Sequence, residues 1–506
     1  MSMYVLSYAL AFIALVLWFY RQEKAESALF RNLLIGGLLA YGATLAFADA
    51  PVVYRLQILL RDLLFLGIFG TAFSFLAGKR VLGFIALLFS LTAIWFYSKQ
   101  VTSYSFPYRQ NIPLDQQGEL LLEVKEGHQI AELDRLARQY GLRWERAFYP
   151  RDAAFTDLDN YYVVNVPDTR RRELPQIMRR LARNPNVAWV EENEQIQAEP
   201  LIAKPAQNPI ADKFGLNDPG VENLWCFRQM NMDQSYNYLN NLRQKPQRKA
   251  VVAILDTGVD SKHEDIKGNF RSIKSEYDND PKGHGTHCAG IAGAVSNNGV
   301  GIASYSRDNA FVEISSIKVL NSSGFGTQKT IVDGMILAAD RGVAVISMSL
   351  GGPSNQTRQR AYESAVKYAQ RAGVIVVAAA GNSNRNAKEF TPANAPGVIC
   401  VSAVDAELNR AEFSNYVQDV EMAVAAPGVN IYSTIPDNKY ATYNGTSMAT
   451  PYVSGLVGLM KSLKPDLTAQ EAYRILNETG KETRSTNLTG KFIQPAPAVK
   501  RLIEGQ

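Results

Sequence analysis

The feature that most limits the fold of this 506-residue chain is a series of short apolar runs that begins after Lys249. Each run ends in small or polar residues, and the runs cover residues 250–255, 343–346, 374–380 and 398–404. Helical patterns at 329–341 and 357–371 lie between them. Continuous apolar strands that alternate with helices are typical of a parallel sheet with helices on both faces. The sequence therefore predicts an α/β fold for this region.

Polar residues follow three of these runs. Asp256 comes directly after the first run, Ser349 lies just beyond the second, and Asn382 follows the third. Ligands of parallel α/β sheets bind at the carboxyl ends of the strands. We therefore expect these three side chains to face one crevice.

Two further segments add chemically active side chains. Residues 283–290 read GHGTHCAG and place His284 at the start of a helix of small residues. Residues 444–451 read NGTSMATP and place Ser447 at the start of an apolar helix. A carboxylate, an imidazole, an amide and a hydroxyl at one sheet edge indicate acyl-transfer chemistry.

The chain order Asp256, His284, Ser447, with these local sequences, resembles the subtilisin-like serine peptidases. The similarity runs from about Asn217 to Ile503 and includes further matching segments. These segments are KVL at 318–320, GFG at 324–326 and SLGG at 349–352. The resemblance implies a subtilisin-like parallel sheet and peptide-bond hydrolysis through an acyl-enzyme.

The resemblance also gives each residue a role. Ser447 is the expected nucleophile, His284 the base that takes and returns its proton, and Asp256 the group that orients His284. The Asn382 side chain and the Ser447 backbone N–H are the expected donors to the oxyanion. This chemistry requires no cofactor.

Substrate is expected to bind as an extended strand between two backbone segments, as the resemblance implies. The expected substrate-binding residues are Gly324, Phe325, Gly326, Ser349, Leu350 and Gly351. The alternative is that these glycines serve only as turn residues.

Asp265 resembles a calcium ligand of the family, but the loop at 296–300 is short where the remaining ligands would lie. The sequence leaves open whether a structural calcium binds. His287 lacks a carboxylate or Cys partner at zinc-ligand spacing, so a structural role is favoured. Cys288 is interpreted as a small apolar filler, and the chain's three cysteines allow at most one disulfide.

The first 98 residues contain four long apolar runs, at 3–20, 32–48, 60–78 and 81–97. Their lengths are close to those of membrane-spanning helices, and the run ends carry aromatic residues. The positions of Lys and Arg in the connections predict a multi-pass protein of the cell membrane, with everything after the fourth span on the extracytoplasmic side. A signal peptide and buried soluble helices are the less favoured alternatives.

Residues 99–116 form an expected linker. From 117 to 197 the pattern reads strand, helix, strand, helix, strand, with one further strand near 145–149, which fits a ferredoxin-like α+β module. This module resembles the family's inhibitory propeptide. Residues 198–209 are richer in Pro and Ala and read as a linker and processing region before the peptidase domain at 210–506.

Together these features predict a membrane-anchored serine endopeptidase that is made as a zymogen and cuts itself between Asn193 and Pro209. The expected partners are polypeptide substrates, the chain's own propeptide, membrane lipid and a further membrane protein. A net charge of +5 is too dilute to indicate a nucleic-acid partner. The alternative is a membrane sensor or assembly subunit that uses the peptidase fold as a binding module.

Overall fold

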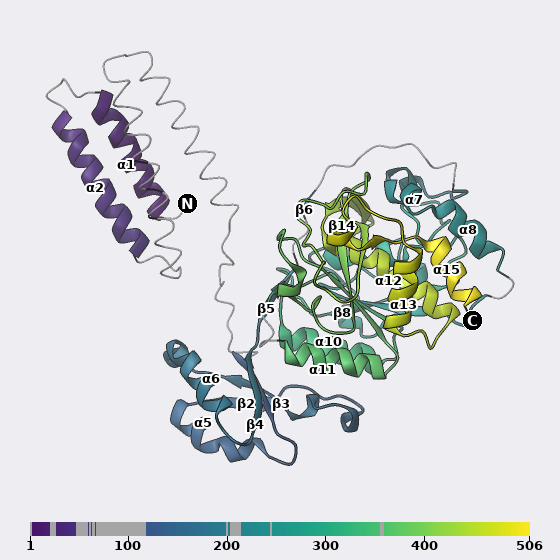
Figure 1. The fold of residues 1–506 in the computed structure, drawn as a ribbon, viewed down its shortest axis with the longest axis horizontal. Helices are drawn as coiled ribbons and strands as arrows, with labels where there is room; N and C mark the ends of the chain where they lie inside the picture. The colour runs from purple at the N-terminus through teal and green to yellow at the C-terminus, as the bar shows by residue number, and fades with distance from the viewer. Residues whose placement is uncertain are drawn as a thin grey trace. The chain divides into compact units, whose positions relative to one another are not determined.

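The structure is a computed structural model that describes residues 3–20, 27–46, 59, 62, 66, 118–198, 201–202, 214–242, 245–354 and 359–505 (Figure 1). The chain divides into two compact units, Met1–Ile112 and Pro113–Gln506.

The first unit contains helices α1 (Met3–Tyr20) and α2 (Ser27–Ala46), which pack against each other. The rings of Tyr8 and Tyr41 lie 5.3 Å apart between the helices. The Tyr41 hydroxyl donates a 2.8 Å hydrogen bond to the carboxylate of Asp62. The apolar side chains of α1 and α2 thus form a small core of their own.

The prediction of a multi-pass membrane protein is wrong. Of the helices in the described ranges, none has the combination of length and apolarity that crossing a membrane requires. The expected spans at 3–20 and 32–48 fall on α1 and α2, whereas those at 60–78 and 81–97 lie outside the described residues apart from positions 62 and 66. The apolarity of a run does not by itself distinguish a helix that faces lipid from one that packs against another helix. The expected lipid and membrane-protein partners rested on the same spans.

The second unit begins with an α+β module. Its elements in chain order are β1 (Leu120–Val124), α5 (Asp134–Tyr140), β2 (Arg143–Arg146), β3 (Tyr161–Asn165), α6 (Leu174–Ala182) and β4 (Val187–Glu192). The strands form an antiparallel sheet in the order β2-β3-β1-β4. This is the βαββαβ arrangement expected from the sequence, and β2 lies close to the strand anticipated near 145–149.

A seven-stranded parallel sheet forms the centre of the remaining chain, in the order β18-β15-β14-β12-β10-β7-β8. Its strands are β7 (Ala250–Asp256), β8 (Val312–Lys318), β10 (Val345–Met348), β12 (Ile375–Ala379), β14 (Val398–Val404), β15 (Ala423–Pro427) and β18 (Lys491–Phe492). All residues of β7, β12 and β14 are buried, because both faces of the sheet are covered. The predicted α/β fold is confirmed.

Helices cover the two faces in two groups (Figure 1). The group nearest the α+β module consists of α10 (Gln328–Asp340) and α11 (Arg360–Arg371). The other face carries α9 (His284–Gly293), α12 (Thr446–Leu463), α13 (Ala469–Thr479) and α15 (Pro495–Glu504). Further helices are α7 (Trp225–Gln229), α8 (Met232–Asn240) and α14 (Thr486–Thr489).

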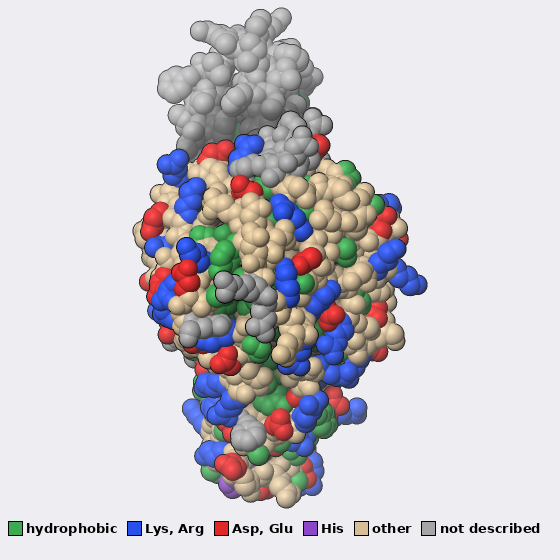
Figure 2. Space-filling model, turned by 90° about the vertical axis from the view of Figure 1, so that its right-hand side faces the viewer, with side chains coloured by type: hydrophobic (Ala, Val, Ile, Leu, Met, Phe, Trp, Pro, Cys, Tyr) green, Lys and Arg blue, Asp and Glu red, His purple; other side chains and the backbone are tan. Residues whose placement is uncertain are grey.

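Short strands lie outside the large sheet and form three smaller sheets, β11-β13, β16-β17-β6 and β5-β9. They are β5 (Gln195–Gln197), β6 (Leu201–Ile202), β9 (Phe325–Thr327), β11 (Gly352–Pro353), β13 (Phe390–Thr391), β16 (Ile431–Ile435) and β17 (Lys439–Asn444). Basic and acidic side chains are interspersed on the face of the molecule shown in Figure 2.

Candidate active site

The carboxyl end of β7 brings together the first two predicted residues. Asp256 is the last residue of β7, and His284 is the first residue of α9. The Nδ1 atom of His284 lies 2.8 and 2.9 Å from the two carboxylate oxygens of Asp256. Both side chains are fully buried. The carboxylate therefore fixes the orientation of the imidazole and favours a proton on Nδ1.

Burial and the neighbouring charge act in opposite directions on His284. Burial lowers the pKa of this side chain, but the charge and hydrogen bond of Asp256 more than offset that effect, so the pKa lies above its usual value. The other ring nitrogen, Nε2, is buried without a hydrogen-bond partner among the described residues. A buried ring atom that lacks a partner is available to exchange a proton with a ligand or side chain.

Asp280 holds the start of α9, and the sequence analysis missed it. One carboxylate oxygen accepts hydrogen bonds from the Gly283 N–H and the Thr257 hydroxyl, both at 2.8 Å. The other accepts from the N–H and the hydroxyl of Thr286, at 2.8 and 2.7 Å. Asp280 thereby joins the turn after β7 to the first turn of the helix that carries His284. The sequence does hold a signal for this role, because Asp280 lies three positions before Gly283 and a negative charge there stabilises the N-terminus of the following helix.

Gly285 allows this close approach. A Cβ atom at this position would lie 2.0 Å from the carbonyl oxygen of Gly258. The helix thus packs directly on the turn after β7, as its run of small residues predicts.

Ser447 lies near the amino end of α12 and is 5% exposed. Its hydroxyl donates a 3.1 Å hydrogen bond to the carbonyl of Ser349. Its carbonyl accepts a 2.7 Å hydrogen bond from the Ser349 hydroxyl. Pro451, four residues later, has no N–H to give that carbonyl, so the helix leaves it free for Ser349. These two bonds attach Ser447 to the carboxyl end of β10.

Cys288 connects the serine to the Asp256–His284 pair. Its sulfur lies 3.5 Å from the carbonyl oxygen of Ser447. It also lies within 4.8 Å of a carboxylate oxygen of Asp256 and a ring nitrogen of His284. The structure therefore places all three predicted residues at one end of the sheet. It gives Ser447 a bond to Ser349, whereas the bond expected between the hydroxyl and His284 Nε2 is not made.

Asn382 follows β12 and reaches the same end of the sheet. Its side-chain oxygen accepts hydrogen bonds from the N–H and the hydroxyl of Thr446, at 2.9 and 2.8 Å. Because the oxygen is engaged, the side-chain NH₂ is left to donate. A Cβ atom built on Gly445 would lie 3.4 Å from this nitrogen, which places the NH₂ group beside the residues that precede Ser447.

The two predicted substrate-binding segments hold a strand of the chain itself. Residues of β5 pair with β9 in antiparallel register, Ile196 opposite Gly326 and Gln197 opposite Phe325. Gln197 also forms a bridge with Gly351. The N–H of Ala198 donates a 3.0 Å hydrogen bond to the carbonyl of Gly324. An extended segment thus lies between the two strands that the sequence assigned to substrate.

The remaining predicted residues of this cleft have defined places. Leu350 is buried in the same apolar cluster as Ile196. Gly324 has a φ of +86°, and a Cβ atom there would lie 2.9 Å from the carbonyl oxygen of Ala198. Glycine is therefore needed at this position for the bound strand to approach.

Asp265 does not fit a calcium ligand in this structure. One carboxylate oxygen accepts a 2.9 Å hydrogen bond from the Asn298 amide, and the other a 2.8 Å bond from the Ile302 N–H. Calcium requires converging oxygen atoms, whereas the groups facing this carboxylate are N–H donors. Burial raises the pKa of Asp265 to about 8. The Asp265 carboxylate instead holds the short loop at 296–300 through Asn298 and the residue Ile302 that follows the loop.

His287 and the cysteines have the structural roles that the sequence favoured. The ring of His287 stacks on Tyr443 at 4.4 Å, Nε2 lies 3.1 Å from the carbonyl of Ala441, and burial lowers its pKa to about 3. All three cysteines, Cys226, Cys288 and Cys400, are buried and free, so no disulfide forms among them.

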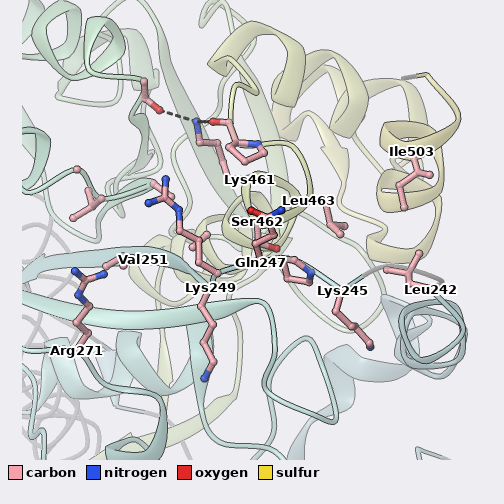
Figure 3. Close-up of a pocket in the computed structure, with 18 of the residues that line it drawn as sticks. Leu242, Lys245, Gln247, Lys249, Val251, Arg271, Lys461, Ser462, Leu463 and Ile503 are labelled. Atoms are coloured by element: carbon pink, nitrogen blue, oxygen red, sulfur yellow. Dashed lines mark hydrogen bonds between the residues drawn. The ribbon is translucent and has the colours of Figure 1, made fainter.

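A large cavity lies at the opposite, amino edge of the sheet (Figure 3). It has a volume of about 1170 Å³ and borders the start of β7. Its charged lining residues are all basic: Lys245, Arg248, Lys249, Arg271 and Lys461. Lys461 donates hydrogen bonds to the carbonyls of Gly373 and Pro465. None of the predicted site residues lines this cavity.

Part of the chain is similar to known proteins. Residues 247–492 match the model of the Subtilase family. Subtilisin DY from Bacillus licheniformis is 43% identical over 247 residues, which cover 48% of this chain and 85% of that protein. The chain belongs to the subtilase family. It is a serine endopeptidase of the subtilisin type, and its substrates are polypeptides.

Two further relatives and a solved structure are also similar to this chain. Thermitase from Thermoactinomyces vulgaris is 44% identical over 218 residues, covering 42% of this chain and 75% of thermitase. An alkaline protease from Alkalihalobacillus alcalophilus is 34% identical over 334 residues, covering 65% of this chain and 77% of the protease. A solved protease structure from Pseudoalteromonas arctica aligns with a TM-score of 0.50 and 29% identity, over 57% of this chain and 99% of that one.

Proposed function

We propose that Asp256, His284 and Ser447 are the catalytic triad of this subtilase. The observation that carries the proposal is the buried pair of Asp256 and His284 beside the start of α12. The orphaned Nε2 of His284 is the atom that takes the proton of Ser447 as its oxygen attacks the substrate carbonyl. Asp256 stabilises the imidazolium that forms, and His284 then gives the proton to the leaving amine.

This mechanism requires the Ser447 hydroxyl to change its hydrogen-bond partner. The Ser447 hydroxyl must leave the Ser349 carbonyl and turn toward His284 Nε2. Rotation about χ1 moves a serine hydroxyl between staggered positions, and hydrogen bonds of catalytic groups often tighten only when substrate is bound.

The side-chain NH₂ of Asn382 and the backbone N–H of Ser447 are the proposed donors to the oxyanion. The two bonds from Thr446 to the Asn382 oxygen support this role, because they orient the amide with its NH₂ group free to donate. The start of α12 contributes the positive end of its helix dipole. Donors that are oriented before the reaction stabilise the negative charge without reorganisation.

We further propose that the α+β module at 117–197 is an inhibitory propeptide. The module supplies acceptors to the free N–H groups at the start of two peptidase helices. Glu191 accepts from the N–H groups of Arg360 and Ala361, at 3.2 and 3.1 Å, and Asn193 accepts from Lys329 at 3.0 Å. Such capping satisfies donors that have no partner within the helix.

An ion pair and an aromatic contact strengthen this interface. The Arg360 guanidinium donates a 3.1 Å hydrogen bond to one oxygen of Glu123, lies 2.9 Å from the other in an ion pair, and lies 5.4 Å from the ring of Trp189. The similarity to the alkaline protease gives independent support, because it is longer than residues 247–492 of the family match. Since the chain ends at Gln506, most of the additional length precedes residue 247.

The protein is therefore proposed to be a zymogen whose active cleft is filled by the end of its own propeptide. It is further proposed to process itself in the linker at 198–209. The test compares the parent chain with Ser447→Ala on an unfolded protein substrate, before and after limited trypsin digestion of the module. We expect activity in the digested parent and none in the variant. Equal activity in both would refute the triad.

A further inference from the structure

The carbonyl of Ser447 lacks the partner that a helix normally supplies. Ser447 is the second residue of α12, and a helical carbonyl accepts its hydrogen bond from the N–H four residues later. Position 451 is a proline, which has no N–H. Because Ser447 is only 5% exposed, solvent does not replace the missing donor. A donor from another part of the chain must therefore bond this carbonyl.

The hydroxyl of Ser349 is that donor. Ser349 follows β10, is 1% exposed, and donates a 2.7 Å hydrogen bond to the Ser447 carbonyl. The sulfur of Cys288 also faces this oxygen, but at 3.5 Å, and a thiol is a weak donor. The Ser349 carbonyl in turn accepts the 3.1 Å bond from the Ser447 hydroxyl. Ser349 thus holds both the backbone and the side chain of the proposed nucleophile.

A second serine of β10 makes a similar bond farther along α12. The Ser454 hydroxyl donates a 2.9 Å hydrogen bond to the Ser347 hydroxyl. Ser347 is likewise 1% exposed and lies two residues before Ser349 in the chain. Ser454 follows Ser447 by seven residues, which is about 10 Å along the helix. The two serines therefore bond the same helix, but only Ser349 bonds the residue that carries the proposed reacting hydroxyl.

We infer that Ser349 is a positioning residue whose hydroxyl fixes the first turn of α12, so that the Ser447 hydroxyl and backbone N–H meet the substrate carbonyl in the reactive orientation. The inference rests on the proposed triad and oxyanion donors. It gives the side chain of Ser349 a role in kcat that is separate from the substrate-binding role expected of its backbone.

Pro451 determines how much the Ser349 hydroxyl matters. In Pro451→Ala, the N–H of residue 451 can bond the Ser447 carbonyl within the helix. The Ser349 hydroxyl then has a competitor for the same oxygen. Loss of the hydroxyl should therefore have a smaller effect in that background, because two groups that act on one atom do not contribute additively.

The experiment measures two rates after trypsin has removed the module: turnover of a peptide substrate and labelling of Ser447 by a fluorophosphonate. Ser349→Ala should lower kcat and the labelling rate by about 10–100-fold, because the reacting atoms are misplaced. KM should change by less than about twofold, because the substrate-binding backbone is retained.

Ser347→Ala is the matched control, since it removes the other buried hydroxyl that bonds α12. In the Ser447→Ala background, where the chain cannot cut itself, Ser347→Ala and Ser349→Ala should lower the unfolding temperature to a similar extent. In the active chain, Ser347→Ala should leave kcat and the labelling rate unchanged, because its bond lies far from the reacting atoms.

Three results would overturn the inference: parental kcat in Ser349→Ala, equal losses of kcat in Ser349→Ala and Ser347→Ala, or a loss confined to KM. If Ser349→Ala does not fold, it is combined with Pro451→Ala, which restores a donor to the Ser447 carbonyl. This double variant should match the kcat of Pro451→Ala within about twofold, and a full further loss would contradict the account. A parent chain that is not labelled at Ser447 would instead refute the triad, so the two failures are distinguishable.

Discussion

The two edges of the seven-stranded sheet differ in what they offer to a ligand. The amino edge carries a cavity of about 1170 Å³ whose charged lining is entirely basic. The carboxyl edge carries the buried Asp256–His284 pair, Asn382, and a strand of the chain lying in the cleft. The cavity of about 1170 Å³ is therefore not where the proposed catalytic groups converge.

This difference teaches that the kind of polar group at an edge identifies the site better than the presence of a cavity does. At the carboxyl edge, each strand end presents a side chain whose partners come from another element, as Asp256 does with α9 and Asn382 with α12. At the amino edge the paired groups are cations, since Lys245 pairs with Asp308, Lys249 with Asn269 and Lys461 with backbone carbonyls. Strand polarity explains the contrast, because residues just beyond the carboxyl ends of parallel strands share one rim.

The largest expected effect concerns the orienting carboxylate. Asp256→Asn should lower kcat by about 10⁴-fold, because the amide no longer holds His284 in the reactive tautomer. The matched change at the other edge, Arg248→Ala, should leave kcat unchanged. Steady-state kinetics on a peptide substrate after removal of the module measures both. Equal losses in the two variants would remove the contrast between the edges.

Removal of the proposed oxyanion donor should have the next largest effect. Asn382→Ala should lower kcat by about 10²–10³-fold with little change in KM, because the amide acts mainly on the charge that develops during the reaction. Separate determination of kcat and KM checks this split. A change confined to KM would assign Asn382 to substrate binding instead.

Weakening the docked module should expose the carboxyl edge. Glu191→Ala leaves the N–H groups of Arg360 and Ala361 without their acceptor, which costs about 1–3 kcal/mol. The full-length variant should therefore react faster with a fluorophosphonate than the parent does. Glu126→Ala, an exposed carboxylate of the same module, is the control. An unchanged rate for Glu191→Ala would show that the linker alone keeps the cleft closed.

The pH dependence of activity should follow His284. Its pKa is raised by Asp256 against the opposing effect of burial, and the reaction needs the neutral imidazole. Activity should therefore fall as pH drops through a value above the ordinary histidine pKa of about 6.5. In Asp256→Asn this limb should move to lower pH, because burial then acts without the compensating charge. A pH profile of kcat/KM for both proteins tests the direction.

The smallest expected effect concerns stability. The pKa of Asp265 is raised from 3.8 to about 8 in the folded chain. Because the pKa is raised, Asp265 contributes fully to the stability of the fold below its pKa in the unfolded chain. This contribution to stability is lost as pH rises through about 8. In the Ser447→Ala background, the unfolding temperature should fall as pH rises through this window, and Asp265→Asn should reduce that fall. Added Ca²⁺ should leave it unchanged; a rise that depends on Asp265 would instead support a calcium site.

The sequence was informative where function depends on residues next to one another in the chain. The end of β7 and the start of α9 follow from apolar runs and small-residue motifs, so Asp256 and His284 could be placed in advance. The strands β8, β15 and β18 were missed, because polar or small residues interrupt their apolar pattern.

Features that depend on tertiary contacts were out of reach. The role of Asp280 exists only because a turn brings it between Thr257 and Thr286. The pairing of Leu201 with Asn444 joins segments that are far apart in the chain. The membrane prediction failed because no helix of the described residues has the length and apolarity that the runs were taken to indicate.

The most direct test of the catalytic assignment is covalent labelling. The full-length chain is treated briefly with trypsin to remove the module, reacted with a fluorophosphonate, and analysed by peptide mass spectrometry. The triad predicts one adduct, on the peptide containing Ser447, and loss of that adduct in Asp256→Asn and His284→Ala. A chain that stays unlabelled at Ser447 while its fold is intact, or labelling that persists without His284, would contradict it.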